Sequence, residues 1–94
     1  MPRYISLLRF TEKGAKEIKK SINRAHAFDR AAEKVGVKVE GQYWTLGGYD
    51  GVLIINADDP VKALRLLAEL SAQGNVRSDT MLAFSDQEFD RLAG

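Results

Sequence analysis

A short aliphatic run in the middle of the chain sets the strongest limit on how this sequence can fold. Residues 52–55 read VLII, a glycine-rich stretch precedes them, and Asp59 and Pro60 follow shortly after. Because successive residues of a strand point to opposite faces of a sheet, residues 52–57 are predicted to form a strand that is apolar on both faces. Each of those faces then needs an apolar cover.

Three further segments show the alternation of strands, and they span residues 3–10, 37–46 and 76–84. In the first of them Ile5 and Leu7 point one way, while Leu8 and Phe10 point the other, so both of its faces are also apolar. The glycines at 47, 48 and 51 predict a tight reversal between the second and third strands.

Two helices are predicted between these strands. Thr11 is a suitable N-cap for a helix over residues 12–35 that stops at Gly36. Asp59 and Pro60 predict the start of a second helix, which stops at residues 73–75. At 100° per residue, the buried stripe of the first helix is expected to consist of Ala15, Ile18, Ile22, Ala25 and Ala32.

The second helix is strongly apolar, and its buried arc is expected to contain Val61, Leu64, Leu66, Leu67, Ala68, Leu70 and Ser71. A short helix is also predicted after the last strand, over residues 86–92. Ser85 and Glu88 have the spacing of a capping box at its start.

The resulting order, β-α-β-β-α-β with a short C-terminal helix, predicts an α+β, ferredoxin-like fold with a four-stranded antiparallel sheet. The chain has 94 residues, so we expect a single domain over 1–94. Both helices lie on one face of such a sheet. The apolar strands leave the other face in need of a cover, and a homodimer or higher homo-oligomer is the expected solution.

Composition argues against several classes of partner. Fourteen Lys and Arg against 13 Asp and Glu give a net charge of +1, without the clustered basic field that nucleic-acid or membrane binding uses. The predicted strand 52–57 carries no aromatic residue, unlike sheets that stack RNA bases. The chain contains no cysteine and no apolar run of membrane-spanning length. We expect a cytoplasmic protein with no nucleic-acid or membrane partner, no metal and no cofactor.

The hairpin segment 43–50, YWTLGGYD, carries a family resemblance that extends over most of the chain through residues 7–11, 14, 24–25, 74–78, 83–84 and 88. It resembles the GYD-domain family, named for its Gly-Tyr-Asp. The resemblance implies a ferredoxin-like fold of the dimeric α/β-barrel kind and brings no established catalytic residue. Residues 57–60 differ from the motif that is usual at this position in that family, although they also begin a helix.

Asp29 is the first candidate site residue, because it falls within the expected apolar stripe of the first helix. A carboxylate there needs a partner or a raised pKa. With His26 and Glu33 one turn away on either side, it could form an acid/base pair or offer metal ligands. The alternative is that the helix is rotated slightly and Asp29 reaches a backbone amide or an arginine.

The hairpin supplies a second candidate group, made of Tyr43, Trp44, Tyr49 and Asp50. The aromatic side chains suit the lip of a pocket, where Asp50 could orient a ligand. Equally, the aromatics could pack at a subunit contact while Asp50 bonds its own turn.

Arg24 and Arg77 are candidate contacts for an anionic ligand, because an arginine can hold a carboxylate through two hydrogen bonds. The simpler interpretation pairs such an arginine with an acidic residue such as Glu88, or lets its stem cover apolar surface. No catalytic residue can be named from the sequence.

The expected function is that of an oligomeric module that binds a small molecule or serves in assembly. Its pocket would lie between the first helix and the sheet, bordered by Asp29, His26 and the hairpin aromatics. The alternative is a cofactor-free small-molecule enzyme, such as an oxygenase or isomerase, because related dimeric α/β barrels often enclose a pocket in that position.

Overall fold

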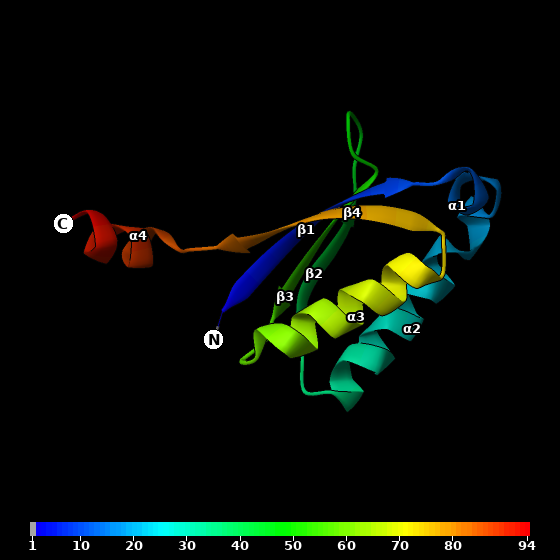
Figure 1. Ribbon diagram of the computed structural model, residues 1–94. Coiled ribbons are helices and arrows are strands. Elements are labelled where there is room, and N and C mark those ends of the chain that lie inside the picture. Colours follow the sequence, from blue (N-terminus) through cyan, green and yellow to red (C-terminus); the bar gives the residue numbers. More distant parts are fainter. Residues whose placement is uncertain (1) are drawn as a thin grey trace.

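The computed structural model describes residues 2–94 and shows a sheet covered by helices on one face (Figure 1). Its elements are β1 (Arg3–Phe10), α1 (Glu12–Lys16), the 3₁₀ turn η1 (Ile18–Lys20), α2 (Ser21–Lys34), β2 (Lys38–Trp44), β3 (Gly51–Asn56), α3 (Pro60–Ala72), β4 (Val76–Ala83) and α4 (Asp86–Ala93). The strands form an antiparallel sheet in the order β2-β3-β1-β4. The predicted ferredoxin-like α+β fold is confirmed.

The core lies between the sheet and the helices α2 and α3. On β3 every second residue is buried, and Leu53 and Ile55 are 2% and 1% exposed. They pack with Phe28 and Ala32 of α2 and with Leu66 of α3. The remaining residues of β3, among them Val52 and Ile54, face away from the helices. The two-sided apolar character predicted for this strand is therefore present in the fold.

The predicted helix over 12–35 is interrupted, and this part of the prediction is wrong. Glu17 leaves the helical conformation, with φ −109° and ψ 35°, and a 3₁₀ turn separates α1 from α2. Ile18 lies in the 3₁₀ turn and Ile22 in the first turn of α2, and both are exposed, at 54% and 52%. Ala32, which belongs to the predicted stripe, and Phe28, which does not, form the buried centre of α2.

Tertiary contacts hold α1 in place. Thr11 caps it as predicted, since its Oγ1 accepts a hydrogen bond from the Gly14 amide at 3.2 Å. The same hydroxyl donates to the Gly74 carbonyl at 2.5 Å, and the Thr11 amide donates to the Asn75 carbonyl at 3.0 Å. Gly14 is buried against this loop. The end of β1 is thereby joined to the loop that precedes β4.

The start of α3 is as predicted, with the Asp59 side chain accepting from the Val61 amide. Its buried face consists of Ala63, Leu66 and Leu67. Val61 and Leu64 are exposed, contrary to the prediction. The helix is apolar over more of its circumference than the sheet can cover, so the sequence pattern alone did not show which apolar residues face the core.

The C-terminal helix α4 extends away from the body of the molecule, beyond the end of β4 (Figure 1). The predicted capping box is present: the Glu88 amide donates to Ser85 Oγ at 3.1 Å, and the Ser85 amide donates to Glu88 Oε1 at 2.9 Å. The apolar side chains of this segment, Phe84, Phe89 and Leu92, are mostly exposed.

Candidate functional site

A cleft with a volume of about 70 Å³ lies between α2 and the sheet. Its walls are mainly apolar and include Leu8, Phe28, Leu53, Leu70 and Val76. Its polar lining comes from Ser21 and Arg24 of α2, Gln42 and Trp44 of β2, Asp50 of the hairpin, and Gln73 and Asn75 before β4. The position agrees with the pocket expected from the sequence, although half of the residues expected to border it lie elsewhere.

Four of the predicted site residues line this cleft, namely Arg24, Tyr43, Trp44 and Asp50. The other four, His26, Asp29, Tyr49 and Arg77, are not part of its lining. Asn75 was missed in the sequence, because it follows a helix-stopping glycine and has the pattern of an ordinary turn residue. The structure buries it to 8% exposure.

Asp29 and His26 do not form a pair. Asp29 is half-buried and accepts a hydrogen bond from Gln42 Nε2 at 2.5 Å. The partner expected for this carboxylate exists, but it is a side-chain amide. His26 is exposed on the other side of α2. Because Phe28 and Ala32 define the buried side of this helix, Asp29 lies at its flank and Glu33 is exposed.

Asp50 fastens the hairpin to β1. Its Oδ2 accepts from the Phe10 amide at 2.8 Å, and its own amide donates to the Leu8 carbonyl at 2.8 Å. The Asp50 carbonyl in turn accepts from the Thr45 amide. The side chain thus bonds the neighbouring strand, in contrast to the expectation that it bonds its own turn.

The three hairpin aromatics have different surroundings. Trp44 is half-exposed and donates from Nε1 to Ser21 Oγ at 2.8 Å, so it bridges β2 and α2 beside the cleft. The Tyr49 ring lies 4.5 Å from the Arg9 guanidinium carbon, and its hydroxyl donates to Asp79. Tyr43, which is among the residues that line the cleft, stands opposite Val52, and its side chain is directed to the face of the sheet that the helices do not cover.

Arg24, Arg77 and Glu88 are not brought together. Arg24 Nη1 donates to the Glu17 carbonyl at 3.0 Å, across the 3₁₀ turn. Arg77 is exposed on β4, where it stands opposite Arg9 of β1. Glu88 is engaged in the cap of α4. The pairing of an arginine with Glu88 was therefore wrong for these two arginines.

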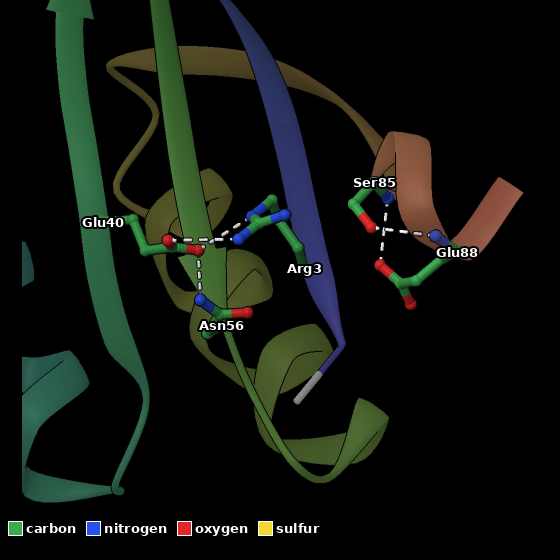
Figure 2. A network of polar contacts seen from close by, with 5 residues as sticks. All are labelled: Arg3, Glu40, Asn56, Ser85 and Glu88. Atoms are coloured by element: carbon green, nitrogen blue, oxygen red, sulfur yellow. Dashed lines mark hydrogen bonds and ion pairs between the residues drawn. The ribbon is translucent and has the colours of Figure 1, made fainter. Parts of the chain in front are cut away.

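Figure 2 shows a polar network that the sequence did not reveal. Arg3 Nε donates to Glu40 Oε1 at 2.9 Å, and Asn56 Nδ2 donates to the same oxygen. An irregularity in the β2–β3 register between Val39 and Gly41 brings Glu40 beside its partners on two other strands. The hydrogen bond from Arg3 holds the pKa of Glu40 below its usual value.

This network predicts a defined dependence of stability on pH. A carboxyl group whose pKa is lowered by folding stabilises the folded state above its unfolded pKa, which is about 4.3 for glutamate, and this contribution is lost as the pH falls through the folded pKa. Glu40→Gln is therefore expected to unfold at lower denaturant concentration than the wild type at pH 7. The difference should close as the pH is lowered towards 3.

Urea denaturation at a series of pH values measures this effect. Arg3→Gln removes the other member of the ion pair. The double variant should be no less stable towards urea than the less stable of the two single variants. A difference between wild type and Glu40→Gln that persists unchanged at pH 3 would contradict the ion-pair assignment.

The second surface of interest is the open face of the sheet, opposite the helices. Ile5 stands between Ile54 of β3 and Met81 of β4, and Leu7 stands opposite Val52. Tyr43 of β2 stands opposite Val52 on its other side. These six apolar residues form the centre of the face, and Arg3, Arg9, Glu40, Arg77 and Asp79 surround them with charges of both signs. We call this surface the open sheet face.

Residues 2–94 contain no group of three or more His, Asp or Glu side chains placed to hold a metal ion. None of the helices in this part of the chain combines the length and the apolarity needed to cross a bilayer.

Comparison with known proteins gives matches that cover nearly the whole chain. The model of the GYD domain matches residues 4–93. A relative from Thermus thermophilus, named "Glutamine synthetase and cystathionine beta-lyase binding protein", is 33% identical over 84 residues, which is 88% of each chain.

Solved structures agree on the fold. The crystal structure of TTHA0845 from Thermus thermophilus has a TM-score of 0.56 and 25% identity, and the alignment covers 90% of this chain and 95% of that one. The C-terminal domain of MgtC from Mycobacterium tuberculosis has a TM-score of 0.55 at 22% identity, with 87% and 86% covered. The crystal structure of MtbAldR has a TM-score of 0.64 at 16% identity. The alignment covers 90% of this chain and 52% of that one.

The last two structures show the shared fold alone, whereas the family is shown by the match over residues 4–93 and by the relative of 33% identity. The hairpin residues 43–50 that first indicated the family lie between β2 and β3, where Asp50 fastens them to β1. This chain belongs to the GYD domain family.

Proposed function

We propose that this chain is a protein-binding assembly module that pairs with a second copy of itself across the open sheet face. The observation that carries the proposal is the apolar centre of that face, made of Ile5, Leu7, Tyr43, Val52, Ile54 and Met81. A sheet face exposed to water is usually polar. Contiguous apolar area of this kind marks an interface, and a two-fold homodimer is the simplest closed assembly.

The dimensions of the face also indicate what else takes part. Four strands about 4.8 Å apart and about 7 residues long present on the order of 450 Å² in flat projection. A stable interface buries roughly 800 Å² on each partner. The projecting helix α4, with Phe89 and Leu92 61% and 78% exposed, offers further apolar area next to β4. We propose that α4 extends the contact onto the second copy.

The relative of 33% identity supports the general class of function, because its name describes it as binding two enzymes. By this likeness we propose that the paired module binds other protein chains, with enzymes as the kind of partner. In the paired state the outward side of α3, with Val61 and Leu64, remains accessible for such contacts.

Single cysteines test the pairing, since the chain has no cysteine of its own. Ile54→Cys places a thiol on the open sheet face, and Leu64→Cys places one on the outward side of α3. Reaction with a maleimide is expected to be slow for Ile54→Cys at high protein concentration and to become faster on dilution. Leu64→Cys should react at the same rate at every concentration. Equal, concentration-independent rates for both variants would exclude pairing through this face.

A further inference from the structure

Two residues that line the cleft between α2 and the sheet each carry a buried polar atom that has no hydrogen-bond partner among residues 2–94. The two atoms are the donor Nη2 of Arg24 and the acceptor Oδ1 of Asn75. A buried polar group without a partner destabilises the folded state, because it has lost its hydrogen bonds to water. Asn75 is 8% exposed, and both residues line the same cleft. One donor and one acceptor left unpaired on residues of the same lining are the pattern of a site that a ligand completes once the two side chains turn towards it.

The neighbouring polar groups do not supply these partners. Arg24 uses Nη1 to bind the Glu17 carbonyl, which fixes the guanidinium and leaves Nη2 free. Gln42 Nε2 is bonded to Asp29, and Asp50 Oδ2 accepts from the Phe10 amide. The carboxylate of Asp50 is the only acidic side chain in the lining, and this hydrogen bond directs it towards β1.

The chemistry of the two atoms selects a class of ligand. A guanidinium nitrogen binds carboxylate oxygens preferentially, through a charge-assisted hydrogen bond. Asn75 Oδ1 requires a donor such as a hydroxyl or amino group. The cleft volume of about 70 Å³ corresponds to on the order of five water molecules, so the ligand has about the same number of heavy atoms. We propose that the cleft binds a short carboxylate whose neighbouring carbon carries a hydrogen-bond donor, with glycolate as the simplest example.

The fluorescence of Trp44 can report ligand binding in the cleft. It is the single tryptophan of the chain and lines the cleft, where its indole donates to Ser21. Titration of the wild-type protein with sodium glycolate is expected to give a saturable change in tryptophan fluorescence. Sodium acetate, which lacks the donor, should bind at least about 5-fold more weakly, consistent with the loss of about 1 kcal/mol for one hydrogen bond. Sodium chloride at equal ionic strength should give no saturable change.

Substitutions separate the two contacts. Arg24→Gln is expected to weaken glycolate binding at least about 10-fold, and the matched control Arg30→Gln, on the exposed side of α2, should bind as the wild type does. Asn75→Ser should lower the affinity for glycolate to that for acetate and leave acetate unchanged. Circular dichroism of each variant confirms that it is folded. The Asn75→Ser comparison still decides the matter if Arg24→Gln does not fold.

The inference can be tested apart from pairing across the open sheet face, because Arg24 and Asn75 are not part of that face, although Tyr43 and Val52 belong to both surfaces. Absence of a saturable response to glycolate at tens of millimolar would overturn it and would mean that water alone occupies the cleft. An equal response to glycolate and acetate that Asn75→Ser leaves unchanged would also overturn the assignment of Asn75. The molar mass, measured in the same samples, tests the proposed pairing separately.

Discussion

Replacement of Gly14 by alanine is expected to lower the free energy of unfolding by about 3 kcal/mol or more. An added Cβ would overlap the Asn75 carbonyl oxygen and lie 2.9 Å from the carbonyl carbon. These are backbone atoms, and the same oxygen accepts the hydrogen bond from the Thr11 amide. The loop before β4 or the helix α1 would have to move, and the contacts of Thr11 would be lost.

The expected loss of stability is opposite in sign to the effect that helix propensity alone predicts for this substitution. Within an ordinary helix, alanine is more stable than glycine by about 1 kcal/mol, so helix propensity alone predicts that Gly14→Ala stabilises the protein. Urea denaturation followed by circular dichroism measures the difference. Gly48→Ala is the control, because a Cβ there meets no atom within 4 Å, and its stability should remain within about 0.5 kcal/mol of the wild type. A Gly14→Ala variant as stable as wild type would contradict the close approach.

Ile54→Lys is expected to weaken the proposed dimer at least about 100-fold. Ile54 lies at the centre of the open sheet face, opposite Ile5 of β1. Two-fold symmetry places the substitution in the interface twice, so two like charges would be buried without partners, at a cost of several kcal/mol. In an isolated chain the lysine would face water, and the fold should therefore be retained.

Sedimentation velocity over a range of concentrations measures this change. Leu64→Lys is the matched control, because Leu64 is equally aliphatic and is exposed on the outward side of α3. It should associate as the wild type does. A folded Ile54→Lys variant with unchanged association would place the interface elsewhere.

Strand positions and most helix ends could be predicted from the sequence because their causes are local. Alternation and glycine turns define the strands, while Asp59, Ser85 and Glu88 cap helices through hydrogen bonds a few residues away. The interruption at Glu17 directly follows α1, whose contacts are distant in sequence. Gly14 and Thr11 are held by the loop around Asn75, about sixty residues later, and no local feature of residues 12–35 indicates this contact.

The candidate site could be predicted only in part, because some of its residues are positioned by contacts that are distant in sequence. The cleft position follows from the fold. Its lining includes Tyr43, Trp44 and Asp50 of the predicted pocket residues and Arg24 of the predicted anion contacts. Asp29 and His26 were misplaced because the buried side of α2 is centred on Phe28 and Ala32, whereas the predicted stripe also contained Ile18 and Ile22, which are exposed. Asn75 could not be recognised, because its burial arises only when the loop packs against the end of β1.

Pairing across the open sheet face is the central claim, and the molar mass of the unmodified chain in solution tests it most directly. The chain has a mass of 10.4 kDa. Sedimentation equilibrium at micromolar concentration is expected to give twice this mass or a higher closed multiple of it. A species of 10.4 kDa that persists throughout the micromolar range would contradict the claim.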